Sequence, residues 1–378
     1  MEYIYFDNAA TSKPYKEALD IFNKVSIDNF ANSASTHLLG YKSNEILEKA
    51  RKQVAKYLNC LPEEVIFTSG ASEANNLAIK GVAYHCKSWA KKLITSKAEH
   101  PSVLNVFKKL ESEGFEVVYL DFDQDGVINY KQLEDALDEH TSLVSIMAVN
   151  NETGYIFDID RISKIIKKKS RAVFHSDITQ AICKENIDYS NVDLLSFSGH
   201  KIGGLKGSGV LIKRKNVNID CQLIGGGQEN GYRSGTSPLG LNCSLATALR
   251  ISFSNMNQRR KRAEELNNFI RSKLQLIDEV VIISPKDASK FILSFALTKH
   301  KGSVIAEYLS NNNIYVSTKS ACSSHEEGFS YVIKDAGYSL QVASNTIRLS
   351  FSGFEELDEA NRFIEVLNRA LLEIKVKD

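Results

Sequence analysis

The sequence lacks a paired-cysteine pattern, a long apolar run and any strong excess of charge. Its six cysteines lie far apart and form no CxxC pair, which argues against a disulfide framework or a zinc site and favours a reduced, cytoplasmic compartment. No stretch approaches the roughly 18 apolar residues of a membrane span. The N-terminus MEYIYFDNAATS has no apolar core like that of a secretory signal. A net charge of +1 gives no case for a nucleic-acid or membrane surface.

What the sequence does have is an alternation of strand and helix patterns from about residue 60 to 215. The candidate strands are apolar almost throughout, as expected when both faces of a sheet are covered. The pattern therefore predicts a large α/β domain with a mainly parallel, seven-stranded sheet. The predicted strands are residues 64–68, 92–96, 115–120, 142–148, 172–175, 192–198 and 209–214.

After residue 255 the pattern changes. A charged helix over 258–277 leads to short strands and to an amphipathic helix near 356–374, which indicates a smaller α+β domain. The first dozen residues are too short to form a unit, and we expect them to pack on this smaller domain. The prediction is a large domain of residues 15–255 and a small domain of residues 1–14 and 256–378.

Three segments look like known binding loops but fail on detail. DFDQDGVINYKQ (121–132) fits the first half of a calcium loop, but Gln132 at its twelfth position cannot supply the bidentate carboxylate. An acidic turn after a strand is the favoured interpretation, and a calcium-binding or scaffold protein is the weaker, non-enzymatic alternative. GGLKGSG (203–209) does not have the order of a P-loop, and GGGQENG (225–231) lacks dinucleotide-binding spacing.

Polar residues follow several predicted strands at their carboxyl ends, where open α/β sheets bind ligands. After the first strand, a glycine turn leads to a helix beginning near Ser72, which is either a phosphate cup or an ordinary capped helix. His100 stands at another strand-to-helix turn, with Pro101 starting the helix. Each such residue alone is more often structural, but together they predict one cleft. The other strand ends carry Asn150, Asn151, Glu152, Asp177, Gln180, Ser198, His200 and Lys201.

One cofactor requires this whole set. Pyridoxal phosphate needs a lysine for a Schiff base, an acid facing its ring nitrogen, a phosphate cradle and a side chain stacked on its ring. A free lysine ammonium, with a pKa of about 10.4, cannot attack a carbonyl at neutral pH, but desolvation and nearby cations depress such a pKa. We therefore predict that Lys201, at the mouth of an apolar strand, binds pyridoxal phosphate.

At this point the chain resembles a known family. The segments FTSGASEANNLAIKG, VNNETG, HSDITQ, SGHKIGGLKGSG and GGGQENGYRSGT are similar to motifs of the cysteine desulfurases, in the class V aminotransferase group of fold-type I pyridoxal-phosphate enzymes. The likeness runs from YFDNAAT to the TIRLS strand. It implies the fold-type I architecture, L-cysteine as substrate, a homodimer, and a protein sulfur acceptor that is a tRNA-thiolating enzyme or an iron–sulfur scaffold.

The resemblance also implies roles for individual residues. Lys201 forms the Schiff base, His100 stacks on the ring and assists proton transfer, Asp177 pairs with the ring nitrogen, and Gln180 hydrogen-bonds the ring oxygen. Thr236 reaches the phosphate bound by the neighbouring subunit. The residues implied to hold the phosphate are Ala71, Ser72, Ser198 and His200, and those implied to hold the substrate carboxylate are Asn151, which also lies at the cofactor, and Arg348.

The discriminating segment is STKSACSS (317–324), where Cys322 stands alone among polar residues. A cysteine that is only a small buried hydrophobe fits Cys60, Cys183 or Cys243 better, and Lys319 favours a thiolate at Cys322. In the family this cysteine attacks the sulfur of the bound substrate, which yields alanine and a persulfide.

Two departures from the family pattern are visible. Lys319 occupies a position that is usually glycine, and Ser33-Ala34 replaces the usual Pro-Ser. Two related activities stay open, selenocysteine lyase and class V transaminase, although a transaminase would have no use for Cys322. The acceptor of the sulfur stays open as well.

Overall fold

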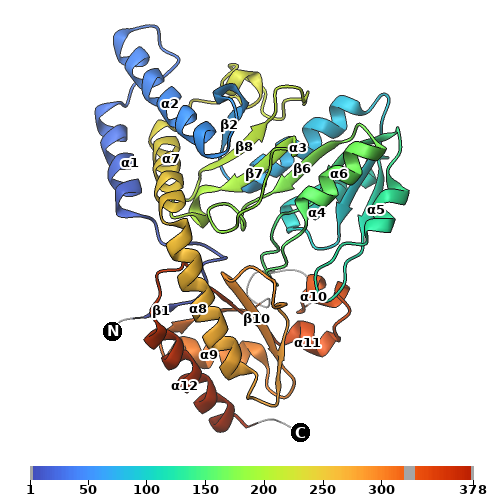
Figure 1. Ribbon diagram of the computed structural model, residues 1–378. Helices are drawn as coiled ribbons and strands as arrows, with labels where there is room; N and C mark the ends of the chain where they lie inside the picture. Colours follow the sequence, from blue (N-terminus) through green and yellow to red (C-terminus); the bar gives the residue numbers. More distant parts are fainter. Residues whose placement is uncertain (1–2, 319–327, 376–378) are drawn as a thin grey trace.

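The computed structural model describes residues 3–318 and 328–375 of the chain. Figure 1 shows two sheets with their helices, one built mainly from the blue-to-yellow part of the chain and one from the orange-to-red part. The predicted nucleophile Cys322 and its neighbour Lys319 lie outside the described residues. In the described part of the chain, no helix is both long and apolar enough to cross a bilayer.

The larger sheet has seven strands in the order β2-β8-β7-β6-β5-β3-β4. β8 runs antiparallel to both of its neighbours, and the other pairs are parallel. The prediction of a mainly parallel, seven-stranded sheet is therefore confirmed. The strands are β2 (Val65–Thr68), β3 (Lys92–Ser96), β4 (Glu116–Leu120), β5 (Thr141–Ser145), β6 (Val173–Asp177), β7 (Leu194–Ser198) and β8 (Gly209–Lys213).

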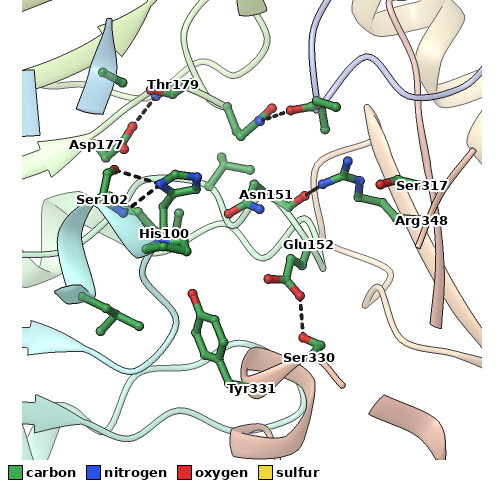
Figure 2. Close-up of a pocket in the computed structure, with 18 of the residues that line it drawn as sticks. His100, Ser102, Asn151, Glu152, Asp177, Thr179, Ser317, Ser330, Tyr331 and Arg348 are labelled. Carbon is green, nitrogen blue, oxygen red and sulfur yellow. Dashed lines mark hydrogen bonds between the residues drawn. The ribbon is translucent and has the colours of Figure 1, made fainter. Parts of the chain in front are cut away.

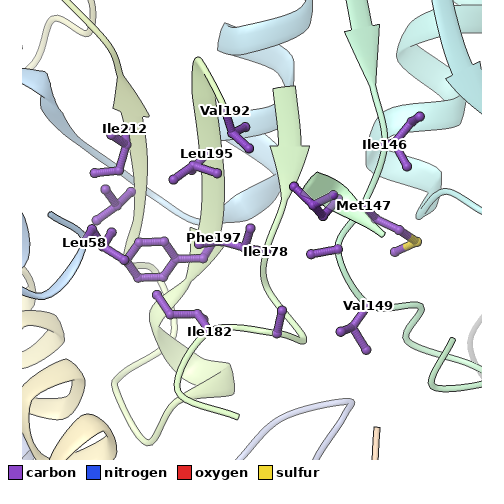
Figure 3. Packing of buried hydrophobic residues seen from close by; sticks show 14 of the residues in the cluster. Leu58, Ile146, Met147, Val149, Ile178, Ile182, Val192, Leu195, Phe197 and Ile212 are labelled. Carbon is purple, nitrogen blue, oxygen red and sulfur yellow. The ribbon is translucent and has the colours of Figure 1, made fainter. Parts of the chain in front are cut away.

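The inner strands of this sheet are buried on both faces, because successive residues point to opposite sides. On one face Leu194 packs with residues of α3 (Ala71–Cys86) and α4 (Pro101–Ser112). On the other face Leu195 and Phe197 join a larger core, part of which Figure 3 shows. This two-sided burial explains the nearly continuous apolar runs. The helices that contribute to the larger core include α2 (Leu38–Tyr57), α5 (Tyr130–Ala136), α6 (Ile159–Lys169) and α7 (Leu239–Ser254).

The smaller sheet has four antiparallel strands in the order β12-β13-β10-β9. One face packs against α8 (Met256–Leu274), α9 (Gly302–Asn311) and α12 (Leu357–Glu373), and the other face contacts α10 (Tyr331–Asp335) and α11 (Leu340–Ser344). The strands are β9 (Val280–Ile282), β10 (Ile292–Leu297), β12 (Ser317–Thr318) and β13 (Thr346–Ser350).

The start of the N-terminal segment packs in the core of the smaller sheet. β1 (Ile4–Tyr5) pairs in parallel with β11 (Ile314–Tyr315), and Phe6 is fully buried in the core of α8, α9 and α12. The segment then passes to the larger sheet, where α1 (Lys16–Asp28) packs on α7. Short 3-10 turns among residues 3–318 are η1 (Pro62–Glu64), η2 (Gly199–Lys201) and η3 (Glu229–Gly231).

The segment that imitates a calcium loop is a closed turn. It follows β4, and one oxygen of the Asp123 carboxylate accepts hydrogen bonds from the backbone N–H groups of Asp125 at 3.0 Å and Val127 at 2.9 Å. A carboxylate that caps its own turn in this way is an ordinary Asx turn. The interpretation as an acidic turn after a strand is confirmed.

Candidate active site

A cavity of about 1020 Å³ lies at the carboxyl ends of β3, β5, β6 and β7, with residues of β12 and β13 also contributing to its lining. Strands far apart in the sequence meet there because the parallel strands of one sheet end at the same edge. Ten of the predicted site residues line the cavity: Ala71, Ser72, His100, Asn151, Asp177, Gln180, Ser198, His200, Lys201 and Arg348.

Lys201 reaches the cavity because β7 passes through the middle of the sheet and ends in η2. Its Nζ donates to the backbone carbonyl oxygens of Ala9 at 2.5 Å and Ala10 at 2.6 Å. The hydroxyl of Ser12 donates to the carbonyl of His200 at 2.8 Å, which ties the N-terminal segment to the same turn. The amine of Lys201 is therefore held at the cavity wall by two acceptors.

Asp177 and His100 belong to one hydrogen-bond network, part of which Figure 2 shows. One oxygen of Asp177 accepts from the backbone N–H of Thr179 at 2.9 Å, and the other accepts from the side-chain amide of Asn75 at 2.8 Å. The same amide nitrogen donates to the hydroxyl of Ser102 at 2.9 Å, and that hydroxyl lies 2.8 Å from Nδ1 of His100. The orientations of the buried acid and of the imidazole are thus linked.

His100 stands where it was predicted, at the start of α4. Pro101 is the first residue of that helix, and the backbone N–H of Ser102 donates to Nδ1 of His100 at 3.1 Å. Because Nδ1 accepts this bond, a neutral imidazole carries its proton on Nε2.

The residues that were predicted to hold a phosphate lie at the start of α3 and at the end of β7. The hydroxyl of Ser198 accepts from the backbone N–H of Ala71 at 2.7 Å, and Ser72 also lines the cavity. The first turn of a helix has N–H groups without intrahelical acceptors, and its dipole favours an anion. Burial, helped by the cations Lys201, Lys206 and Lys184, lowers the pKa of His200 to about 4. His200 is therefore neutral at pH 7, and it can offer a phosphate a hydrogen bond but no positive charge.

Arg348 enters from the smaller sheet. Its strand neighbours Ile347 and Leu349 are buried in the core behind β13, so the alternation of a strand turns Arg348 toward the cavity. Nη2 pairs with the Asp7 carboxylate at 2.8 Å, and Nη1 donates to the backbone carbonyl of Asn151 at 2.8 Å. Nε is buried and has no partner among the described residues, and because only two of the five guanidinium N–H groups are engaged there, donors are left for a carboxylate ligand. Figure 2 shows Arg348 beside Asn151.

Among the described residues, Thr236 and the fully buried Asn150 do not line the cavity, although both were predicted to lie there. Thr236 is exposed and lies in the loop after η3, which the buried Arg51–Glu229 pair and the Arg233–Glu73 pair hold in place. Cys322 lies outside the described residues.

Several lining residues were not predicted. Ala9 and Ala10 contribute backbone carbonyls, which leave no mark on the side-chain pattern. Ser330 donates to the Glu152 carboxylate, and the hydroxyl of Tyr331 donates to the backbone carbonyl of Glu99 at 2.5 Å. These two residues begin α10, a five-residue helix that is too short for periodicity to reveal it.

The residues present suit pyridoxal phosphate. The cavity brings together a lysine, a buried carboxylate, an imidazole and a helix N-terminus, which match the cofactor's aldehyde, ring nitrogen, ring face and phosphate. Buried polar atoms next to the acid, Thr179 Oγ1 and Asn75 Oδ1, have no partner among the described residues. A polar ligand at this end of the cavity would satisfy such atoms.

The chain is similar to known proteins over nearly its whole length. The family model described as aminotransferase class-V matches residues 4–363. A protein of Lactobacillus delbrueckii subsp. bulgaricus, named NifS/IcsS protein homolog, is 38% identical over 366 residues, which cover 96% of this chain and 95% of the relative. Cysteine desulfurase IscS of Shewanella oneidensis is 37% identical over 378 residues, which cover 97% of this chain and 92% of that protein.

The fold agrees with these similarities. A solved structure named NIFS-LIKE PROTEIN superposes with a TM-score of 0.94 at 34% sequence identity, and the match covers 99% of this chain and 100% of that one. Likeness of this extent includes both sheets and every strand end that contributes to the cavity.

Proposed function

The chain belongs to the class-V aminotransferase family, among its pyridoxal-phosphate-dependent cysteine desulfurases, and on that premise we propose that it takes sulfur from L-cysteine and holds it on Cys322. The products are L-alanine and a persulfide on that cysteine. The observation that carries the proposal is the convergence of Lys201, Asp177 and His100, from three strand ends of the larger sheet, and of Arg348, from the middle of β13, on one cavity.

Each of these residues has a proposed task. Lys201 holds the cofactor through its carbonyl carbon and moves the proton at the substrate Cα. His100 stacks on the ring, and Asp177 faces the ring nitrogen. When bound, pyridoxal phosphate supplies an electron sink for the negative charge that develops next to the amino group. The bound Asp7 carboxylate and Asn151 carbonyl fix the Arg348 guanidinium, and a guanidinium oriented in this way suits the substrate carboxylate.

Cys322 is the proposed nucleophile. Its thiolate forms a bond to the substrate sulfur, and the bond between that sulfur and Cβ breaks. The electron pair of the broken bond stays with the carbon, which takes up a proton to become the methyl group of alanine, and the sulfur atom remains on Cys322 as a persulfide. Other cysteines are poorly suited to this task. Burial raises the pKa of Cys60 and Cys183 to about 12 and that of Cys243 to about 11, so these thiols stay protonated at neutral pH.

We also propose a homodimer. Apolar side chains are exposed on α1, on the segment between α1 and α2, at the start of α2 and on the loop before Thr236: Ile27 at 74%, Phe30 at 77%, Leu38 at 67% and Ile224 at 90%. Exposed apolar surface of this kind marks an association site. A second copy of the chain that covers it is the proposed partner, and Thr236 would reach the phosphate held by that copy.

The sulfur then passes to an acceptor protein, which we propose to be a tRNA-thiolating enzyme or an iron–sulfur scaffold in a reduced, cytoplasmic compartment. A persulfide suits both routes, because its outer sulfur is open to attack by a second thiol. Labelled sulfur from L-cysteine, followed into each acceptor class in turn, would distinguish the two routes.

The first experiment compares alanine release from L-cysteine by the wild-type protein and by Cys322→Ser, with a reductant present and with equal bound cofactor. We expect alanine from the wild type and a loss of at least about a hundredfold in the variant, because serine is a far weaker nucleophile toward sulfur. Equal rates would remove Cys322 from the reaction.

Two further comparisons sharpen this test. Cys221→Ser removes another cysteine that is not fully buried, and we expect it to release alanine at the wild-type rate. If neither the wild type nor the variants release alanine although cofactor is bound, the proposed desulfuration is wrong and amino transfer to a keto acid is the reaction to assay.

A further inference from the structure

Lys184 is a buried lysine for which the proposed reaction has no use. It is 3% exposed and follows β6 in the chain, behind the cavity wall. Its Nζ donates to Oε1 of Gln180 at 3.0 Å, so its acceptor is a neutral amide rather than a carboxylate. Burial of an amine in such surroundings is costly. The cost of this burial indicates that Lys184 has a function.

The backbone around Lys184 is held firmly. Ile178 and Ile182 are buried in the larger core, where Figure 3 shows them beside Phe197. Cys183 has a φ of 59°, a left-handed conformation that is unfavourable for a residue with a side chain and persists only where the surroundings enforce it. This conformation ends the turn, and the side chain of Lys184 lies against Gln180.

The contacts of Gln180 fix the orientation of its amide. Nε2 donates to the backbone carbonyl of Ala9 at 3.0 Å, and a carbonyl can only accept. The nitrogen must therefore face Ala9, and the oxygen must face Lys184. Gln180 lines the cavity, so its second N–H is the group it offers to a ligand there. Because the Ala9 carbonyl also accepts from Lys201, one network joins Lys184 to the cofactor lysine.

We propose that Lys184 is a positioning residue: it anchors the Gln180 amide so that one N–H stays on the Ala9 carbonyl and the other faces the cavity and the ring oxygen of pyridoxal phosphate. This inference rests on the proposed function, from which it takes the contact between Gln180 and the cofactor. A donor favours the anionic form of the oxygen that it contacts. By holding the Gln180 donor in place, Lys184 therefore lowers the pKa of the bound cofactor.

The test is a pH titration of the visible absorbance of protein loaded with pyridoxal phosphate, without substrate. In Lys184→Met the hydrogen bond to Gln180 is lost while the volume is nearly kept. We expect the midpoint to rise by about one pH unit, a tenfold change in proton affinity. An unchanged midpoint overturns the proposal.

A double-mutant cycle separates positioning from a direct effect of charge. If Lys184 acts through Gln180, then Gln180→Met and the double variant Lys184→Met/Gln180→Met have the same midpoint, because the second change has nothing left to remove. Additive shifts would mean that Lys184 acts on the cofactor independently of Gln180, and the proposal is then wrong.

The chain provides a matched control. Lys213 is 5% exposed and donates to the backbone carbonyl of Val217 at 2.7 Å, but it does not line the cavity in the described part of the chain. Lys213→Met also removes a buried lysine bound to a neutral acceptor, and we expect no change in the midpoint. A rise equal to that of Lys184→Met would assign the effect to general loosening.

Two provisions keep the outcomes apart. If Lys184→Met does not fold, Lys184→Asn replaces it, because the shorter polar side chain of asparagine cannot reach Gln180 and tolerates hydration. The same rise of the midpoint is expected, and an unchanged midpoint counts against the proposal.

If wild-type protein develops no visible band with the cofactor, the proposed function fails. If the wild type has the band and the lysine variants share its midpoint, only the inference about Lys184 fails.

Discussion

At the scale of single residues, burial decides which ionisable groups near the cavity carry charge. Burial lowers the pKa of His175 and of His200 to about 4, so both rings are neutral at pH 7. Burial also raises the pKa of Glu99 to about 8, so this carboxyl next to His100 is largely protonated. The protonated Glu99 carries no negative charge that would repel an anionic cofactor, and the two neutral imidazoles carry no positive charge that would attract it.

Lys184 gives a prediction about stability as well. Burial, followed by the cations Arg259 and Lys201, lowers the pKa of Lys184 from 10.5 to about 7, against weaker opposing effects of Cys183 and Glu185. Between these two pH values the unfolded chain binds a proton that the folded protein does not bind. The free energy of unfolding therefore rises with pH across this window.

In Lys184→Met this contribution disappears, so we expect the free energy of unfolding to rise less steeply between about pH 7 and 10.5 than in the wild type. Urea unfolding of the cofactor-free protein at several pH values measures both slopes. Identical slopes would show that Lys184 keeps its proton in the folded protein.

Among single residues, the sequence could predict only those whose side-chain type stands out at its position in the pattern. Lys201, Asp177 and His100 stand at strand ends, where polar residues after apolar runs are visible, and all three line the cavity. Lys184 lies in the segment AICKEN, where a lysine beside a glutamate is typical of an exposed turn. The Ala9 and Ala10 carbonyls could not be predicted, because every residue has one.

At the scale of elements, the close approach of β8 to the turn before α3 shapes the proposed phosphate cup. A Cβ atom at Gly209 would lie 2.5 Å from the Cα of Gly70 and 2.8 Å from its nitrogen. Both are backbone atoms, so the turn that precedes Ala71 would have to move. The glycine in β8 is therefore required by the neighbouring strand end.

Gly209→Ala is accordingly expected to weaken pyridoxal phosphate binding by about tenfold or more and to lower the free energy of unfolding by about 1–3 kcal/mol. Cofactor titration and urea unfolding measure the two effects. Gly114→Ala is the control, because Gly114 has a φ of 90° and no atom within 4 Å of its added Cβ. It should lose about 1 kcal/mol and bind the cofactor normally; a cofactor defect there would make the effect at Gly209 nonspecific.

The elements with strong periodicity were predicted and the short ones were not. All seven strands of the larger sheet and the helices α8 and α12 lie within a few residues of the predicted ranges, and α3 and α4 begin within a residue of their predicted starts. The hydrophobic pattern could not predict the direction of β8, because a buried strand has the same apolar residues whether it runs parallel or antiparallel to its neighbours. α10 was missed since five residues give no helical period, although Tyr331 of this helix and its N-cap residue Ser330 line the cavity.

At the scale of the whole molecule, the site joins two structural units. Arg348 comes from a strand whose core is formed with α8, α9 and α12, whereas Lys201 and Asp177 come from the larger sheet. The division into residues 15–255 on one side and 1–14 with 256–378 on the other stays a prediction. A physical argument supports this division, because a substrate that contacts both Arg348 and Lys201 would link the two units.

The proposed dimer extends this dependence to a second chain. Thr236 is exposed and does not line its own cavity in the described part of the chain, so its proposed contact with a phosphate requires a partner. Two variants divide the proposed site between subunits. Lys201→Ala loses the cofactor lysine but keeps Thr236, and Thr236→Asp keeps Lys201 but sets a carboxylate against the partner's phosphate.

Each variant alone is expected to release little alanine from L-cysteine. When the two are unfolded together and refolded, half of the dimers pair randomly as hybrids. One site in each hybrid combines an intact Lys201 with an intact Thr236 from the other chain, so we expect roughly a quarter of the wild-type activity per subunit. If Thr236 acted within its own chain, every hybrid site would carry one defect, and the mixture would stay as inactive as its components. Refolding Lys201→Ala with the double variant Lys201→Ala/Thr236→Asp must restore nothing, because no subunit then supplies the lysine.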